Sequence, residues 1–260
     1  MKKALRRTLF AASCLASLLI VITSCSDKSD EITPQNEVTV PAEVRDKLDR
    51  LGFNTKGMQV AGDGYLVEGD ILITGAALTE LDEVDEEHYR IPNLINCNGG
   101  QTITIYGNLS GNLSAGLNYA IANFNAVNTC FTFQRVYSSP ATINVSLVNG
   151  TWAYSGLPSG GNPYPVIGIG SGAGAYGANY VECLFTHNIG HCIGVLHSDP
   201  FANDNSCPND GGGSQYGAVH IPGTPTGPDP NSIFNKCACA NTNTNGELSS
   251  SDRNALSYMF

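Results

Sequence analysis

The sequence predicts an α+β fold, because its strand and helix patterns do not follow a strict alternation. Hydrophobic residues make up 42% of the 260 residues, which is enough for a packed core and excludes wholesale disorder. Charged residues are sparse, at 14%, and the stretch 198–250 is rich in Gly, Pro and Asn. We therefore expect a packed region of strands and helices followed by a long, loop-rich part.

Residues 1–24 have the features of a bacterial lipoprotein signal peptide. Basic residues precede an apolar run, 9–22, that is too short to span a hydrocarbon core of about 30 Å. The run ends in Ile22-Thr23-Ser24-Cys25, which resembles a lipobox, so we expect Cys25 to carry the lipid after cleavage. A plain secretory signal with a coincidental cysteine is the alternative. The basic residues are Lys2, Lys3, Arg6 and Arg7.

Residues 25–40 are polar and contain Pro and Thr, which is typical of a flexible tether. The tether would hold the folded part away from a membrane. We therefore expect an exported protein that is lipid-anchored to a bacterial membrane, at the outer membrane or the cell surface.

The charge of the mature chain excludes nucleic acid as a partner. The first 25 residues hold four of the 13 Lys and Arg and none of the 23 Asp and Glu, so the remainder has a net charge of −14. Such a chain repels phosphate backbones.

Cysteine usage agrees with export into an oxidising compartment. The chain has nine cysteines, of which Cys14 leaves with the signal peptide and Cys25 takes the lipid. An odd number remains, so we expect disulfides and one thiol that is free or paired elsewhere. The spacing does not define their connectivity, and we interpret them as cross-links rather than metal ligands. They are residues 97, 130, 183, 192, 207, 237 and 239.

Residues 41–90 predict a small segment of one helix and one hairpin. Pro41 suits a first helical turn, apolar residues recur at helical spacing after it, and Gly52 offers a stop. The runs 65–67 and 71–73 are typical of two strands joined by a turn at 68–70. About fifty residues are too few for us to expect independent folding.

Residues 91–260 form the main predicted domain. Strands are expected at 102–106, 131–133, 143–147 and 164–169, and a helix around 117–124. A second helix should run from about Tyr180 to Val195, with Asn179 as its N-cap and Glu182 completing a capping box. A short final helix should be capped by Ser251 or Asp252.

Three histidines within this second helix and just after it predict a zinc site. On a helix, His187 and His191 lie about 40° apart in azimuth and one turn apart in height, so both rings can face one metal. Gly194 allows the chain to leave the helix with a positive φ and bring His197 round as a third ligand. Three histidines with an open fourth position are typical of catalytic zinc.

This segment resembles the zinc-binding consensus of the metzincin peptidases, H-E-x-x-H-x-x-G-x-x-H. Together with the runs 65–70 and 220–232, it is similar to the dual-action HEIGH metallopeptidases, many of which are bacterial lipoproteins. The similarity spans roughly residues 41–260. It implies a metzincin-like zinc peptidase domain at 91–260, with a small twisted sheet and a zinc-site helix, behind a pro-region at 41–90. It also implies one Zn²⁺ and a peptide or protein substrate.

The sequence departs from the family where the chemistry happens. Asn188 stands where the family has the glutamate that serves as general base, and an amide cannot take up that proton. Phe234 stands where metzincins have the methionine of a turn beneath the zinc, and it should still provide an apolar floor. Asp199, just after the third histidine, is expected to orient a ligand histidine as a neighbouring carboxylate.

Two hypotheses follow from these departures. The first is a working metallopeptidase that uses a substitute general base. The second, which we prefer, is a zinc- or peptide-binding homologue in which hydrolysis is weak or lost. If the pro-region covers the zinc, it cannot do so through a thiol, because no cysteine lies between Cys25 and Cys97. An unspecified acidic residue of that region would serve instead.

Overall fold

The computed structural model describes residues 39–81, 94–97, 99–199, 221–226 and 229–260. They belong to one compact unit, Val38–Phe260. The predicted signal peptide, Cys25 and nearly all of the tether lie outside the described residues. Within the described part of the chain, no helix is long and apolar enough to cross a bilayer.

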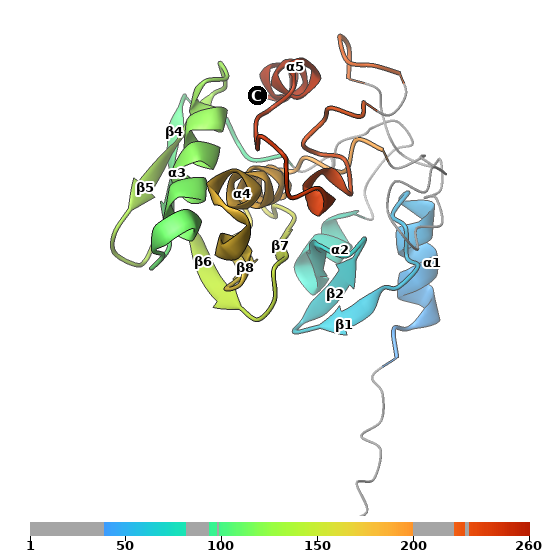
Figure 1. The fold of residues 1–260 in the computed structure, drawn as a ribbon. Coiled ribbons are helices and arrows are strands. Elements are labelled where there is room, and N and C mark those ends of the chain that lie inside the picture. Colours follow the sequence, from blue (N-terminus) through green and yellow to red (C-terminus); the bar gives the residue numbers. More distant parts are fainter. Residues whose placement is uncertain (1–38, 82–93, 98, 200–220, 227–228) are drawn as a thin grey trace, which may run out of the picture. The chain divides into compact units, whose positions relative to one another are not determined.

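An eight-stranded mixed sheet organises the unit, with the order β1-β2-β3-β7-β8-β6-β4-β5 (Figure 1). The strands β8, β6, β4 and β5 run parallel, whereas β7 is antiparallel to β8. The predicted α+β class is confirmed. The bounds of the strands are β1 Gln59–Ala61, β2 Gly64–Val67, β3 Ile71–Thr74, β4 Gln101–Tyr106, β5 Phe131–Val136, β6 Ile143–Val148, β7 Ala153–Gly156 and β8 Val166–Gly170.

The helices α3, Gly111–Asn125, and α4, Ala178–Ile193, pack against each other beside the sheet (Figure 1). Their shared core includes Leu117, Phe124 and Phe185, and β4 contributes Ile105. Fourteen of the sixteen residues of α4 are buried, so its polar side chains from Glu182 onward are enclosed by protein. The shorter helices are α1 Ala42–Arg50, α2 Gly75–Glu80, η2 Ala173–Tyr176, η3 Ala238–Ala240 and α5 Ser250–Met259.

The N-terminal segment, residues 39–81, is joined to the main domain through the sheet. Strands β2 and β3 form the predicted hairpin, and β3 then pairs in parallel with β7. A second core beneath this hairpin includes Leu48 and Ile73, and Leu157 of the main domain packs into it. The segment therefore shares both a sheet and a core with the rest of the chain.

Two predicted helix caps are wrong. Gly177, with φ 99°, is the N-cap of α4 in place of Asn179, and no side chain caps that end. Glu182 accepts a hydrogen bond from the buried Asn123 amide at 2.9 Å instead of completing a capping box. The final helix begins earlier than expected, with Ser249 as its N-cap and Asp252 at the third helical position of a capping box.

The cysteines act as cross-links, as predicted. Disulfides join Cys97 to Cys130 and Cys183 to Cys239, and Cys237 is also disulfide-bonded. Cys192 of α4 is a buried free thiol. The second disulfide fixes η3 to the first half of α4, and so ties the loop-rich part of the chain to the helix that carries the histidines.

Loss of the Cys183–Cys239 bond should destabilise the fold measurably. The two cysteines are 56 residues apart, so their cross-link removes about 4 kcal/mol of loop entropy from the unfolded chain. The double variant Cys183→Ala/Cys239→Ala should lower Tm by about 10 °C under non-reducing conditions. Cys192→Ala removes a buried sulfur from the same helix without opening a cross-link, and should cost on the order of 1 kcal/mol. Equal losses in the two variants would contradict the assignment.

Candidate metal centre

The end of α4 brings three histidines together. His187 and His191 lie one turn apart on the helix, and Gly194 adopts a left-handed φ of 107° that ends it. The N–H of Val195 then donates to the Gly190 carbonyl at 2.9 Å, which folds the chain back on itself. His197 follows three residues after the glycine, and all three rings are buried.

The hydrogen bonds of two of these rings fix their tautomers. His187 Nδ1 lies 2.7 Å from the Ile233 carbonyl and His191 Nδ1 lies 2.8 Å from the Val195 carbonyl. A carbonyl only accepts, so each neutral ring carries its proton on Nδ1 and leaves a bare lone pair on Nε2. The Nε2 of His187 is 2.9 Å from that of His191 and 3.1 Å from that of His197. At these distances the lone pairs repel one another, and a cation between them would relieve that repulsion.

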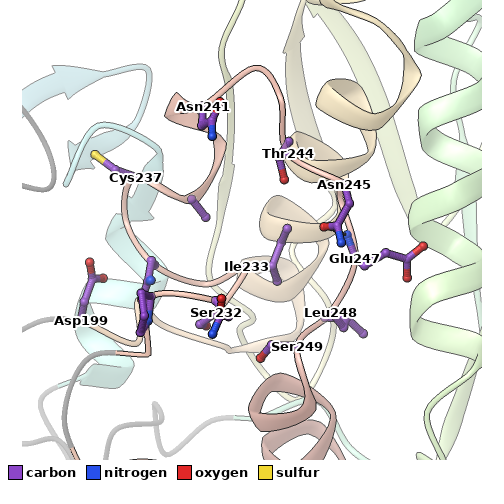
Figure 2. A pocket seen from close by; sticks show the side chains of 14 residues that line it. Asp199, Ser232, Ile233, Cys237, Asn241, Thr244, Asn245, Glu247, Leu248 and Ser249 are labelled. Carbon is purple, nitrogen blue, oxygen red and sulfur yellow. Dashed lines mark hydrogen bonds between the residues drawn. The ribbon is translucent and has the colours of Figure 1, made fainter.

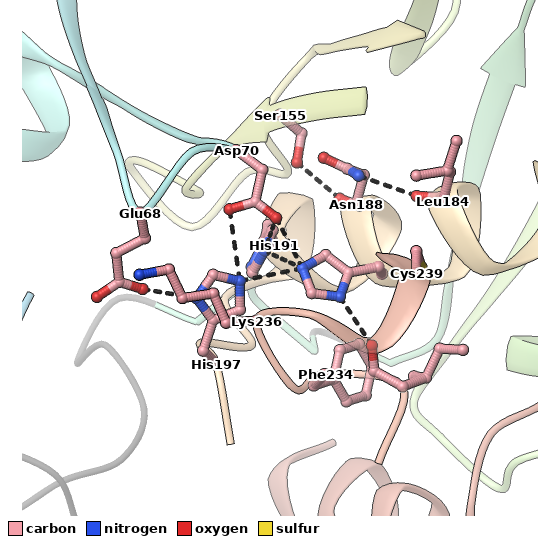
Figure 3. A network of polar contacts seen from close by, with 12 residues as sticks. Glu68, Asp70, Ser155, Leu184, Asn188, His191, His197, Phe234, Lys236 and Cys239 are labelled. Carbon is pink, nitrogen blue, oxygen red and sulfur yellow. Dashed lines mark hydrogen bonds and ion pairs between the residues drawn. The ribbon is translucent and has the colours of Figure 1, made fainter. Parts of the chain in front are cut away.

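Asp70 adds a carboxylate to the cluster from the turn between β2 and β3 (Figure 3). One oxygen, Oδ2, lies 2.9 Å from His187 Nε2, and the other, Oδ1, lies 3.4 Å from His197 Nε2. Oδ1 is buried and accepts no hydrogen bond from the described residues.

The four donor atoms fit one zinc ion. They lie within 4.8 Å of one another. A tetrahedral zinc with bonds of about 2.0–2.1 Å would place its ligands about 3.3 Å apart, close to the separations found here. Asp70, His187, His191 and His197 can therefore hold a single Zn²⁺, the metal predicted from the sequence.

Glu68, rather than the predicted Asp199, is the carboxylate that contacts the Nδ1 atom of a ligand histidine. Glu68 Oε2 accepts a hydrogen bond from His197 Nδ1 at 2.6 Å. Asp199 accepts instead from the backbone N–H of Lys236 at 2.9 Å, and no hydrogen bond or ion pair joins it to a histidine among the described residues. Asp199 therefore holds the backbone at Lys236, two residues after Phe234, rather than a metal ligand.

The charges of the two turn carboxylates change the acidity of the cluster. For His197, burial disfavours the imidazolium, but the charge and close contact of Asp70 and the hydrogen bond to Glu68 outweigh that effect and raise the pKa of His197 to about 10. Burial lowers the pKa of His191 to about 4. Burial opposes ionisation of Asp70 as well, yet the charge on His197 and the close contacts with the three rings hold the pKa of Asp70 well below its usual range.

Asn188 is enclosed between the histidines and turned along its own helix. Its side chain is 1% exposed, and the amide nitrogen donates to the Leu184 carbonyl at 2.9 Å (Figure 3). Its Oδ1 accepts no hydrogen bond from the described residues. The hydroxyl of Ser155, on β7, donates to the Asn188 carbonyl at 2.8 Å. The side chain at position 188, where the sequence analysis expects the general base of the family, is therefore a buried, neutral amide.

Phe234, which the sequence analysis expects as an apolar floor, packs against the end of α4 that carries the histidines. Its ring centroid is 6.3 Å from that of His187, and a Cβ built on Gly190 would lie 2.2 Å from Phe234 Cε1. Only glycine leaves room for the ring at position 190. The Phe234 carbonyl accepts from the Ser198 N–H at 2.9 Å, which ties this turn to the residue after His197.

A cavity of about 810 Å³ with a mixed polar and apolar lining lies among the loops that follow the histidine segment (Figure 2). Asp199 and Glu247 give its lining two carboxylates, and asparagine and serine side chains supply most of its other polar groups. None of the three histidines lines it, so it is separate from the metal cluster.

Sequence reasoning missed the identity of the two acidic residues at the site. Glu68 and Asp70 flank Gly69 in the hairpin turn, and an acidic ligand from residues 41–90 was expected without being named. Their signal was a pair of carboxylates at the tip of a predicted hairpin. Of the other site residues, Asn188 lies on α4 beside the ligand histidines, and Phe234 packs against Gly190 and His187.

Zinc uptake should release about one proton. Because the pKa of His197 is raised to about 10, its ring is charged in metal-free protein at neutral pH and must lose a proton to become a ligand. The apparent zinc affinity should then rise about tenfold per pH unit from pH 6 to 8. Calorimetry in buffers of different ionisation enthalpy measures the proton count. A count of zero at pH 7 would contradict the assigned charge on His197.

One family model and several solved structures match this chain. The family model of the dual-action HEIGH metallopeptidases matches residues 65–260. Two solved structures of myroilysin are each 19% identical, with TM-scores of 0.42 and 0.41; they cover 64% and 61% of this chain and 86% and 92% of their own. The hatching enzyme zinc-protease HCE-1 of Oryzias latipes is 19% identical, with a TM-score of 0.40, and covers 64% of this chain and 92% of its own. Comparison with curated proteins gave no match.

The family match includes the β2–β3 turn that carries Asp70 as well as the histidine segment and the Phe234 turn. The match therefore spans all four donors of the cluster, and the chain belongs to the dual-action HEIGH metallopeptidase family.

Proposed function

We propose that this chain is an exported, lipid-anchored zinc metallopeptidase homologue in which peptide-bond hydrolysis is weak or lost. His187, His191 and His197 would hold Zn²⁺, and a peptide or protein would be the substrate or ligand. Bound zinc supplies a Lewis acid for a peptide carbonyl and lowers the pKa of water. At position 188, beside the zinc ligands, the chain lacks a side chain that could take a proton from the attacking water and pass it on.

The amide of Asn188 is the observation that carries this proposal. In the family pattern that position holds a carboxylate, which contributes about 10²–10⁴-fold to the rate as a general base. Here the side chain is neutral, is 1% exposed and donates to the Leu184 carbonyl of its own helix. It therefore supplies neither a base nor a flexible acceptor for a proton.

Asp70 supports a second part of the proposal, that the attached N-terminal segment keeps the metal closed. Its carboxylate occupies the direction of the fourth ligand, 2.9 Å from His187 Nε2. A site with four protein ligands resembles structural zinc, whereas catalytic zinc keeps one position for water. The pairing of β3 with β7 holds Asp70 there.

A working peptidase with a substitute base is the rival proposal. Glu182 is the described carboxylate with suitable acidity, because burial and the nearby Glu247 charge raise its pKa to about 7. It lies about 240° round α4 from Asn188, and it accepts a hydrogen bond from Asn123. Its direction thus favours a role between α3 and α4 rather than at the zinc.

Restoring the carboxylate should restore hydrolysis. In a chain with Asp70→Ala to open the fourth position, Asn188→Glu should raise the rate of peptide-library cleavage by about 10²–10⁴-fold over Asn188. The rate is measured by mass spectrometry of cleavage products with zinc present and again with chelator.

Asn188→Gln in the same background is the matched control. It has the length of glutamate without the proton-accepting charge, so it should leave the chain as inactive as Asn188. Chelator-sensitive cleavage by the Asp70→Ala chain at a rate close to that of its Asn188→Glu derivative would establish the rival proposal instead.

The lipid anchor has its own test. Cells that produce the full chain with a labelled fatty acid should yield a labelled protein in the membrane fraction. Cys25→Ala should remove the label, because Cys25 is the cysteine of the expected lipobox. Cys14→Ala, which changes the cysteine within the signal peptide, should keep the label. An unlabelled native chain would favour a plain secretory signal.

A further inference from the structure

We infer that Glu68 is a positioning residue for the zinc ligand His197, so that the N-terminal segment is a working part of the metal centre. This inference rests on the proposed zinc-binding function and goes beyond it. Asp70 acts as a fourth ligand and so closes the metal site. Glu68, two residues earlier, holds one of the ligands contributed by the main domain.

His197 differs from the other two histidines in the group that its Nδ1 atom contacts. His187 and His191 are oriented by backbone carbonyls of the main domain, those of Ile233 and Val195. His197 has the Glu68 carboxylate at 2.6 Å instead, with side chains that are 2% and 7% exposed for the histidine and the glutamate. A buried hydrogen bond with an ionised acceptor is roughly twice as strong as a neutral one. The third ligand therefore depends on a residue of the N-terminal segment.

Both carboxylate oxygens of Glu68 accept hydrogen bonds. Its second oxygen, Oε1, accepts from the backbone N–H of Asn54 at 2.8 Å, so the carboxylate bridges the N-terminal segment and His197. Its backbone has a φ of 54°, a left-handed conformation that costs a residue with a Cβ about 1 kcal/mol or more. Burial opposes its ionisation, but the hydrogen bond to His197 and the charges of His197 and Lys236 lower its pKa.

The direction of Glu68 depends on the hairpin. Val67 pairs with Ile71, and the Asp70 N–H donates to the Val67 carbonyl at 3.3 Å, so the turn is closed around Glu68 and Gly69. Both carboxylates of this turn face the histidines (Figure 3). One short turn thus supplies a metal ligand and the group that orients another ligand.

The consequence is measurable as zinc affinity. Carboxylates that orient a ligand histidine typically contribute 10–100-fold to metal affinity, because they fix both the ring and its tautomer. In the full chain, Glu68→Gln should weaken zinc binding by about 10- to 100-fold, measured by competition with a chromophoric chelator. Glu43→Gln, an exposed residue of α1, makes the same charge change in the same segment and should leave the affinity unchanged.

A double-variant cycle distinguishes positioning of His197 from a general effect on the fold. If Glu68 acts through His197, Glu68→Gln should have no further effect on zinc affinity in a His197→Ala chain. It should keep its full effect in a His191→Ala chain, where His197 is still present. The visible spectrum of the Co²⁺-loaded chain should change with Glu68→Gln and not with Glu43→Gln.

Glu68→Asp provides a second variant that tolerates the left-handed backbone and keeps the charge, but is one methylene too short to reach His197. It should also weaken zinc binding. An equal effect of Glu68→Gln in the His197→Ala and native backgrounds, or native affinity in both Glu68 variants, would overturn the inference while leaving zinc binding intact. A native chain that binds no zinc would overturn the proposed function itself.

Discussion

The convergence of three imidazole nitrogens on one point is the constraint on which the rest of this structure depends. Bare Nε2 lone pairs about 3 Å apart are unfavourable unless each ring is held by a hydrogen bond at Nδ1 and a positive charge lies between the rings. The acceptors of these hydrogen bonds come from three regions of the chain: Val195 after α4, Ile233 in the C-terminal loops, and Glu68 in the N-terminal hairpin. Regions far apart in the sequence must therefore all be in place for one site to form.

The long C-terminal loops have a structural role in this arrangement. Asp252 accepts from the Ile233 N–H at 2.9 Å and from the Ser232 hydroxyl at 2.6 Å, while it also closes the capping box of α5. The start of the last helix thus fixes the carbonyl that orients His187. The Cys183–Cys239 bond anchors the same loops to α4. A loop of this length needs such anchors to place a backbone acceptor reproducibly.

Local spacing was enough to predict α4, its glycine exit and the three histidines, because helix geometry places residues four apart on one face. It did not predict β7, Ala153–Gly156, because the strand is short, three of its four residues are small and they show no clear alternation. Without β7, nothing in the sequence places the β2–β3 turn against the histidines, so Glu68 and Asp70 had no assigned role. The predicted capping box failed for a related reason: Glu182 finds a buried partner in Asn123, a contact between helices that outweighs a local cap.

The placement of Glu68 and Asp70 on one turn links metal binding to docking of the N-terminal segment. A ligand that binds one arrangement better than another stabilises it, and the coupling free energy is the same in both directions. Zinc should therefore strengthen the contact of β3 with β7, and that contact should tighten the zinc site through His197. In an active peptidase such coupling would oppose release of the segment. If this chain has lost hydrolysis, as we propose, the same coupling would instead stabilise the fold without any cost to activity.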